Sequence, residues 1–419
     1  HLGGAVNFRV IDPPSSAIPY FVKQLGDEIS WRHQSVLYPE NVISIENVNE
    51  LKNYFKTDIF YFAKGEYICE SAHISSGIKV YGGFSGNETE PTPDNRIRTD
   101  LDGYGITEPW EFQHATIFTG SYKNNFTSNK RAITIQGNGE LNGVTFQQYT
   151  VTGESGVISV GTPHNIGESN NLSKGILRNT IVDGVKSTFQ RGILMITAGS
   201  EVSSCLIQND TITVANSGGA VYLATSGGVL KNSVVRNCVA TGISSRGAAI
   251  HADIPANNQN TEFLIQNCLI YNNRSTISPV IRQDVYTTFG TPINTLGCQI
   301  VNCTFFNNHS TAGNALIDVN AVNTILINTL MYSEQHHLLR SISGGIITAI
   351  NCLTNKSMTG LTETSTGNVV NATLSEYKFE RPFVKNHSQL EKNTADYYDM
   401  ISSSYLITDN SSLAVTNKG

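Results

Sequence analysis

A motif built around asparagine recurs along the chain. FLIQNCLIYNN at residues 263–273 is followed, 35 residues later, by CQIVNCTFFNN at 298–308. Related segments place an asparagine, or once a serine, at the same position between apolar residues: Asn142, Asn179, Ser204, Asn232, Asn267, Asn302, Asn328 and Asn351. The steps between them run from 23 to 37 residues, with a mean of about 30. An irregular period of this length is typical of a solenoid with loops of variable length.

Residues around this key position alternate in character. The residue two places before it is apolar (Leu177, Val202, Leu230, Ile265, Ile300, Leu326 and Ala349), as is the residue three places after it (Val182, Ile207, Val235, Ile270, Phe305 and Met331). The residue directly after it is small: Gly143, Thr180, Cys205, Ser233, Cys268, Cys303, Thr329 and Cys352. Alternation predicts a strand on each side of the asparagine, and asparagine favours a turn between them.

The asparagines and cysteines of this motif could be ligands, nucleophiles or structural units of the repeat. A second asparagine at 209, 237, 272 and 307 predicts a second turn, and asparagines stacked coil upon coil can form an amide ladder. We interpret the motif as structural. Cys268, Cys303 and Cys352 are then expected to be buried, reduced and in register, with Ile265 and Ile270 facing the core.

The fold class follows from short strands with turns and no helical period between them. Hexapeptide repeats are too regular to fit, and the leucine-rich signature is absent, which leaves a parallel β-helix. VNELKNYFK at 48–56 predicts a short amphipathic helix, with Leu51, Tyr54 and Phe55 on one side, that closes the N-terminal end. We therefore predict an N-terminal extension (1–40), the β-helix (41–374) and a C-terminal capping segment (375–419).

Composition excludes several classes of function. Only 15% of residues are charged, the net charge is −6, and no run of Lys or Arg occurs, which argues against a nucleic-acid partner. No apolar run is long enough to span a membrane. The first residues do not resemble a signal peptide, so for an exported protein we expect the signal to have been removed or left out. Seven cysteines without C-x-x-C spacing indicate neither zinc nor a complete disulfide set. We expect a monomer.

Two segments carry a family resemblance. FYFAKGEYICESAHISSGIKVYGGFSGNETE at 60–90 and ATIFTG at 115–120 resemble the N-terminal signature of exported bacterial right-handed β-helix proteins of the pectate-lyase-like superfamily, including surface proteins of Bacteroidetes. YLITDNSSLAVTNKG at the end of the sequence resembles the close of the same family. The resemblance implies a right-handed, single-stranded β-helix that is secreted or displayed at the outer-membrane surface. GGFSGNE lacks a phosphate-loop lysine and is expected to form the turn that starts the first coils.

A further strand is predicted after each key asparagine, in segments such as AAIHADI at 248–254 and PVIRQDV at 279–285. The third residues of these segments are apolar and expected inward: Leu194, Val221, Ile250, Ile281, Ile317 and Leu339. The fourth residues are expected outward, as one column: Met195, Tyr222, His251, Arg282, Asp318 and Arg340. The sixth residues add a parallel column of Asp253, Asp284 and Asn320.

These columns are the candidate site. His251, Arg282, Asp253 and Asp284 are the candidate catalytic residues, and the candidate substrate-binding residues are Tyr222, Asp318, Arg340 and Asn320. Adjacent aspartates can raise one pKa to supply a general acid, or hold Ca²⁺; no other cofactor is expected. Arginines could neutralise a uronate while His251 or an arginine takes a proton.

Long connections and competing interpretations bear on this face. The connections from His251 to Asn267 and from Arg282 to Asn302 span 16 and 20 residues, against 9 to 11 elsewhere, so PANNQNTE and VYTTFGTPINTLG are expected to wall the face. Alternating charges can equally be a solvated surface, and the apolar second positions leave room for an inward–outward shift of one residue.

Two functional hypotheses remain. The first is an exported surface protein that binds a polysaccharide, or a cell-surface glycan or protein, without catalysis. The alternative is a polysaccharide lyase or glycoside hydrolase acting on acidic polysaccharide along the 251–340 face. The close Asp-Asp pairs of polygalacturonase-type hydrolases and a lyase signature are both absent from the sequence.

Overall fold

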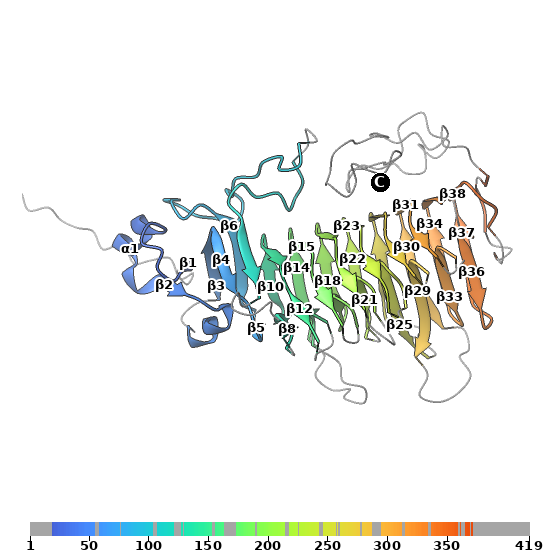
Figure 1. Cartoon of the computed structure of the whole chain (residues 1–419), viewed down its shortest axis with the longest axis horizontal. Coiled ribbons are helices and arrows are strands. Elements are labelled where there is room, and N and C mark those ends of the chain that lie inside the picture. Colours follow the sequence, from blue (N-terminus) through green and yellow to red (C-terminus); the bar gives the residue numbers. More distant parts are fainter. Residues whose placement is uncertain are drawn as a thin grey trace, which may run out of the picture.

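The chain winds into a right-handed parallel β-helix in the computed structural model (Figure 1). The structure describes residues 19–371, apart from short gaps at 55–57, 76, 104–106, 121–126, 129, 153–155, 163–172, 189–190, 214–217, 225, 243–245, 257, 259, 277–278, 287–294, 312–314, 334–336, 359–360, 362–364 and 369. Four sheets run along the stack, and every pairing between named strands is parallel. The predicted fold class is confirmed.

Sheets 1 and 2 hold the strands before and after the key asparagine. Sheet 1 has the spatial order β2-β1-β3-β6 and then continues in chain order: β2 Val42–Ile45, β1 Tyr20–Gln24, β3 Ile59–Ala63, β6 Lys79–Phe84, β10 Gly139–Asn142, β14 Gly175–Arg178, β18 Ser200–Ser203, β22 Gly228–Lys231, β26 Phe263–Gln266, β30 Leu296–Val301, β34 Asn323–Ile327 and β37 Ile346–Ile350. Sheet 2 consists of β4 Gly65–Ile68, β7 Thr116–Thr119, β11 Thr145–Gln147, β15 Ile181–Asp183, β19 Leu206–Gln208, β23 Val234–Arg236, β27 Leu269–Tyr271, β31 Thr304–Phe306, β35 Leu330–Tyr332 and β38 Leu353–Thr354.

Sheets 3 and 4 complete each coil. Sheet 3 has two-residue strands: β8 Thr127–Ser128, β12 Thr150–Val151, β16 Lys186–Ser187, β20 Thr211–Ile212, β24 Val239–Ala240, β28 Arg274–Ser275 and β32 His309–Ser310. Sheet 4 contains the strands of the candidate site: β5 Ala72–Ile74, β9 Ile133–Ile135, β13 Ile158–Val160, β17 Leu194–Ile196, β21 Val221–Leu223, β25 Ile250–Pro255, β29 Ile281–Tyr286, β33 Ile317–Asn320 and β36 Leu339–Ile342.

The key asparagines are the corners between sheets 1 and 2. Asn232, Asn267 and Asn302 have φ of 49°, 51° and 52°, and Ser204 in the same column has 55°. This left-handed conformation is one that asparagine adopts more readily than most residues, which explains the column. The second-turn asparagines have φ between 46° and 57° as well. Amide ladders connect coils in pairs, as where Asn267 Nδ2 donates to Asn232 Oδ1 at 3.0 Å.

One position of the sequence alignment is wrong. Asn142 pairs with Arg178, not with Asn179, so it is the last residue of β10. Gly143, with φ of 80°, takes the corner in that coil. Glycine adopts left-handed angles without strain, so it replaces asparagine at the corner and shifts the asparagine pattern by one residue.

The small residue after the corner has a role beyond its size. Cys268 and Cys303 are fully or almost fully buried, and each thiol lies against the backbone carbonyl two residues earlier, 3.1 Å from Gln266 O and 3.3 Å from Val301 O. Ser233 and Thr329 make the same contact with their hydroxyl groups. Cysteine therefore alternates with serine and threonine here because each supplies a short side-chain donor. All seven cysteines are buried and free, as predicted for Cys268, Cys303 and Cys352.

One continuous apolar core fills the interior from β1 to β38. It contains the predicted inward residues Ile265 and Ile270, together with the equivalent positions of the other coils. Within the described residues, no helix is long and apolar enough to cross a membrane.

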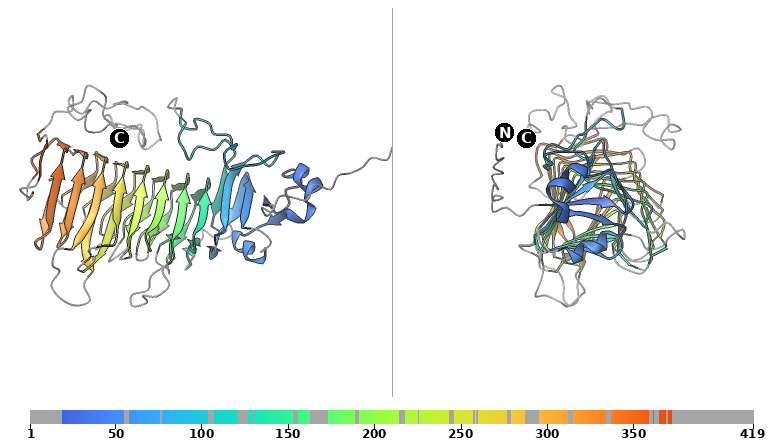
Figure 2. Two further views of the ribbon diagram at one scale, coloured as in Figure 1. Left: turned by 180° about the vertical axis from the view of Figure 1, so that it is seen from behind. Right: turned by 90° about the vertical axis from the view of Figure 1, so that its left-hand side faces the viewer.

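The N-terminal end is closed by short helices and by the first strands. Residues 48–53 form a 3₁₀ helix, η2 (Val48–Asn53), in place of the predicted amphipathic helix, with Leu51 buried in the core and Tyr54 packed against it. Phe55 lies outside the described residues. A capping box of Asn47 and Glu50 holds its start. Figure 2 (right) shows blue elements lying over this end of the stack.

Sheet 1 begins earlier than the predicted boundary at residue 41, because β1 lies between β2 and β3. The helices α1 (Arg32–Leu37) and η1 (Pro39–Asn41) follow β1. The GGFSGNE motif forms a turn at the end of β6, where the Glu88 carboxylate accepts hydrogen bonds from the backbone N–H groups of Ser85 and Gly86. Residues 375–419, the predicted C-terminal capping segment, lie outside the described residues.

Candidate functional site

The two columns predicted on sheet 4 exist in register. Tyr222 pairs with His251, His251 with Arg282, Arg282 with Asp318, and Asp318 with Arg340. In the second column Asp253 pairs with Asp284, and Asp284 with Asn320. The side chains of all eight predicted site residues therefore fall on one face of neighbouring coils, at the spacing of parallel strands.

The inward–outward assignment holds, and the apolar second positions have a separate explanation. Both the third positions, such as Ile250, and the second positions, such as Ala249, belong to the main core. The second residue precedes the strand, at the corner where the chain bends into sheet 4, so both residues can point inward. Met195 and Tyr222, at fourth positions, form a separate buried cluster with Ala224 on the other side of the sheet.

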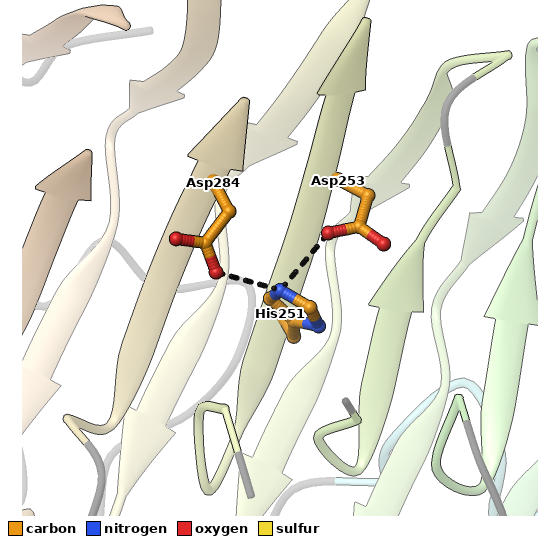
Figure 3. Close-up of side chains that lie close together, drawn as sticks. All are labelled: His251, Asp253 and Asp284. Carbon is orange, nitrogen blue, oxygen red and sulfur yellow. Dashed lines mark hydrogen bonds and ion pairs between the residues drawn. The ribbon is translucent and has the colours of Figure 1, made fainter. Parts of the chain in front are cut away.

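His251 lies at the centre of the site (Figure 3). Its Nε2 is 3.2 Å from Asp253 Oδ1 and 3.3 Å from Asp284 Oδ2, while its Nδ1 accepts a hydrogen bond from the Gly218 backbone N–H at 3.3 Å. This arrangement fixes the tautomer with the proton on Nε2, which is directed at the two carboxylates. The imidazole is completely buried, so it has no surface that a ligand could reach directly.

Two guanidinium groups hold Asp284. Arg282 Nε donates to both carboxylate oxygens, at 3.0 and 2.8 Å, and Arg246 Nη1 donates to Oδ2 at 3.2 Å. Asn320 Nδ2 adds a hydrogen bond to Oδ1 at 2.9 Å. The Asp284 side chain is only 4% exposed, whereas those of Arg282 and Arg246 are 24% and 45% exposed. A buried anion therefore anchors two cations that reach the surface.

The protonation states follow from this surplus of donors. Burial alone raises the pKa of Asp284, but hydrogen bonds and charge from His251 and Arg282 outweigh it and hold that pKa far below its usual range. Burial likewise raises the pKa of Asp253, but His251 and the Tyr222 hydroxyl lower it overall. The adjacent carboxylates thus do not raise one pKa, as a general acid would require. Every donor that contacts them stabilises the ionised form.

His251 and Arg282 respond in the opposite sense. Burial lowers the pKa of His251, yet the charges and hydrogen bonds of Asp253 and Asp284 raise it above its ordinary value. A second proton on Nδ1 would face the Gly218 N–H, which opposes protonation at that atom. Burial also lowers the pKa of Arg282, and Asp284 raises it overall, so Arg282 is unsuited to act as a base.

The remaining predicted residues complete the face. The Asp318 carboxylate is fully buried and accepts hydrogen bonds from Arg340 Nε, at 2.8 Å, and from Nη2. Burial nevertheless raises the pKa of Asp318, although Arg340 opposes the shift. The Tyr222 ring lies 5.4 Å from the His251 ring, and its hydroxyl donates to Asp253. Asp318 and Arg340 therefore repeat, farther along the stack, the pairing of a buried aspartate with an exposed arginine.

Gly218 and Arg246 were missed by the sequence analysis. Each precedes a sheet 4 strand, folds outward and contacts the following coil, and the two residues form an isolated antiparallel bridge with each other. Arg191, before β17, reaches the next coil in the same way, with its guanidinium carbon 6.0 Å from the Tyr222 ring centre. The Arg-Gly pairs at 191–192 and 246–247 are the sequence signal that could have found Arg191 and Arg246.

The described residues include part of the predicted walls. Asn258, within PANNQNTE, donates to the carbonyls of both Thr261 and Leu296, which joins the first long connection to the end of the second. Residues 287–294, which form much of VYTTFGTPINTLG, lie outside the described residues.

A metal ion has poor support at this site. His251, Asp253 and Asp284 each offer a ligand atom within 4.8 Å of the others. Ca²⁺ takes six to eight oxygen ligands, whereas this cluster offers one nitrogen and two carboxylates, one of them already shared by two guanidinium groups. The donor set does not fit Ca²⁺.

Comparisons with known proteins give distant structural similarity alone. No protein-family model matches the chain, and no curated protein matches its sequence. Catalytic domains of GH87 α-1,3-glucanase variants in complex with nigerose are similar at 10% identity with TM-scores of 0.33 and 0.34, and a complex with tetrasaccharides at 10% identity with 0.27. Each match covers 88% of this chain and 70% of the other. The function proposed below therefore rests on the residues of sheet 4.

Proposed function

We propose that this protein binds an anionic polysaccharide, without catalysis, on the outer face of sheet 4. The supporting observation is that buried Asp284 fixes the guanidinium groups of Arg282 and Arg246 at the surface. Arg282 uses only Nε for this contact, and its two terminal nitrogens donate no hydrogen bond within the described part of the chain. A guanidinium group held in this way can donate two parallel hydrogen bonds to the oxygens of a carboxylate or sulfate group.

The same contacts argue against the lyase and hydrolase alternative. Hydrolysis needs an accessible carboxyl group that keeps a proton at working pH. The pKa values of Asp253 and Asp284 are both lowered, and Asp318, whose pKa is raised, is fully buried against Arg340. Elimination needs an accessible base, but His251 is buried with its Nε2 directed at carboxylates. Location at the cell surface or in the medium stays a prediction.

Affinity electrophoresis through gels containing polygalacturonate, alginate or neutral dextran tests the proposal. We expect retardation by the two uronate polymers and none by dextran. Arg282→Ala and Arg246→Ala should each weaken binding about ten-fold to a hundred-fold, the range for one hydrogen-bonded ion pair. Arg274→Ala is the matched control, because Arg274 is an exposed arginine on sheet 3. Retardation should decrease as salt is added.

Two further measurements separate binding from folding and from turnover. Arg282→Lys keeps the positive charge but loses the two parallel N–H donors of the guanidinium group, so we expect it to bind with intermediate affinity. Circular dichroism should show that this variant remains folded. Unsaturated uronate absorbance and reducing-end release are followed in the same samples. Turnover that is abolished by Arg282→Ala, or equal retardation of Arg282→Ala, Arg246→Ala and the parent, would overturn the proposal.

A further inference from the structure

A polar cavity of about 480 Å³ lies far from the sheet 4 site, against the outer side of sheet 1. Its floor comes from β6, β10 and β14, and its other wall is the insertion between β6 and β7, which rises from the edge of the stack in Figure 1. The cavity is large enough for a small organic ligand. Its lining includes three arginines and two carboxylates: Arg96, Arg98, Arg178, Asp94 and Glu140.

Arg96 ties the insertion to sheet 1 and forms a rigid part of the lining. Its guanidinium donates to the carbonyls of Pro93, Gly82 and Asn142 and to Asn142 Oδ1, at 2.7 to 3.3 Å. The group also lies over the Phe112 ring, 4.6 Å from its centre. Burial and the positive charge of Arg98 lower the pKa of Arg96 to about 10, so it stays charged at neutral pH. This residue defines the shape of the cavity.

Arg98 and Arg178 supply hydrogen-bond donors that the protein leaves unused. Arg98 is exposed, with its guanidinium carbon 5.1 Å from the centre of the Phe112 ring, and it donates no hydrogen bond within the described ranges. Arg178 Nη2 donates to Glu201 at 3.2 Å, but its Nε is buried without a hydrogen-bond partner. Buried donors are rarely left unpaired, so an unpaired one beside a cavity indicates a ligand or water there.

Asn179 and Glu140 supply acceptors on the same wall. Asn179 Nδ2 donates to Asn142 Oδ1 at 2.9 Å, and Asn142 Nδ2 donates to Glu140 Oε1 at 3.0 Å. The amide ladder stops at Asn179 because the next coil has Ser204 at the corner. As a result, no residue in the described part of the chain donates to Asn179 Oδ1. The cavity therefore presents donors and acceptors side by side.

These groups identify the chemistry of the ligand. Sugar hydroxyls both donate and accept, so they match a wall where arginine donors alternate with amide and carboxylate acceptors. Three guanidinium groups line the cavity with two carboxylates, and Glu201, which pairs with Arg178, is also paired with Lys231, so one positive charge remains, which suits one carboxylate on the ligand. A bare oxyanion would be repelled by Asp94 and Glu140 and would leave Asn179 without a donor. We propose that this cavity binds one uronic acid residue, independently of sheet 4.

Calorimetry or ligand-observed NMR with D-galacturonic acid tests the proposal on the whole chain. We expect one galacturonate bound in this cavity, with galactose and sodium sulfate each binding there at least about ten-fold more weakly. Arg98→Gln should weaken galacturonate binding about ten-fold or more, and Asn179→Gly about five-fold. Glycine is chosen because residue 179 has φ of 49°, so the backbone is not strained.

Controls distinguish this site from the one on sheet 4. Arg274→Gln should leave the affinity of this cavity for galacturonate unchanged, because Arg274 is exposed on sheet 3, and Arg98→Gln should remain folded because Arg98 is exposed. If Arg98→Gln loses galacturonate binding and the control does not, the cavity is a uronate-binding site. This result would hold even if polymer retention did not depend on Arg282, so the two proposals can fail separately. Undetectable galacturonate binding by the parent would overturn the inference. So would equal affinities for sulfate, galactose and galacturonate, or an Arg98→Gln variant that binds like the parent.

Discussion

Asp210 offers a sharp test of how the core of the β-helix is built. Its side chain is buried, Oδ1 accepts the Val185 N–H at 2.8 Å, and Oδ2 is buried without a hydrogen-bond partner. Two and three coils farther along, Asn273 and Asn308 occupy the same column. Their Nδ2 groups donate to the carbonyls of Val235 and Ile270 in the preceding coil, at 2.9 and 2.7 Å.

Register then assigns the missing partner of Asp210. In the coil before Asn273 this column is occupied by Cys238, and Val235 lies three residues earlier; Ile270 has the same relation to Asn308. In the coil before Asp210 the equivalent carbonyl belongs to Val182. Two oxygens facing each other require a proton between them, so we infer that Asp210 is a neutral carboxylic acid. Burial raises its pKa well above the ordinary value, in agreement with this assignment.

Asp210→Asn is therefore expected to stabilise the protein. Keeping an aspartate protonated at pH 7, when its unfolded pKa is about 3.9, costs about 4 kcal/mol, since each pH unit contributes about 1.4 kcal/mol. A raised folded pKa means that this penalty is absent below the unfolded pKa and grows as pH rises. The variant should gain up to about 4 kcal/mol at pH 7 and almost nothing at pH 4.

Urea unfolding followed by circular dichroism, at half-unit steps from pH 4 to pH 7.5, measures the difference. Asn308→Asp is the matched control, because it places the same acid in the same column and should lose stability with the opposite pH dependence. A gain that does not change with pH, or a loss of stability at pH 7 in Asp210→Asn, would refute the reasoning.

Three further outcomes are expected. The seven thiols should resist iodoacetamide in the native state and react in urea, by mass spectrometry, and Cys268→Ser should lose no more than about 1 kcal/mol because a hydroxyl makes the same contact with the Gln266 carbonyl. Asn232→Ala should lower the free energy of unfolding by about 1–2 kcal/mol and Asn232→Gly by less, because φ is 49° there. Asp284→Asn should lose about 3–5 kcal/mol at pH 7 in urea titrations. Since folding lowers the pKa of Asp284, the parent's advantage should persist down to the unfolded pKa of about 4 and then decline progressively as pH falls below it toward the folded pKa.

The repeat could be recognised from the sequence because the corner residue of each coil must adopt a left-handed backbone conformation. Left-handed φ values confine that position to asparagine, glycine and few others, so Asn232, Asn267 and Asn302 appear as a column. The same requirement explains the misplacement of Asn142, because Gly143 meets it equally well. The strand register of sheet 4 followed from one apolar column, since a slip of one residue would expose Ile250 and Ile281.

The surroundings of the site were not readable in this way. His251 and Asp318 are fully buried although they point out of the core, because Gly218, before β21, contacts His251 and the Arg340 side chain contacts Asp318. Those residues, Gly218 and Arg246, belong to connections of variable length, where no period relates one coil to the next. The charge state of a carboxyl group also depends on all of its neighbours. Two adjacent aspartates alone predict that one pKa is raised, but the arginine and histidine beside Asp284 lower its pKa instead.

The architecture predicts how the two proposed sites should interact. In a solenoid each coil contacts only its neighbours, so a local change is transmitted through stacking interactions between successive coils. The cavity uses the coils of β6, β10 and β14, whereas Arg282 lies on β29, which completes the coil of β26, so the coils of β18 and β22 lie between the cavity and Arg282. Substitutions with no shared partners should then be additive in free energy. The double variant Arg98→Gln/Arg282→Ala should therefore bind galacturonate as weakly as Arg98→Gln alone and be retained by the polymer as weakly as Arg282→Ala alone. Coupling beyond about 0.5 kcal/mol would indicate that one acidic glycan spans both sites.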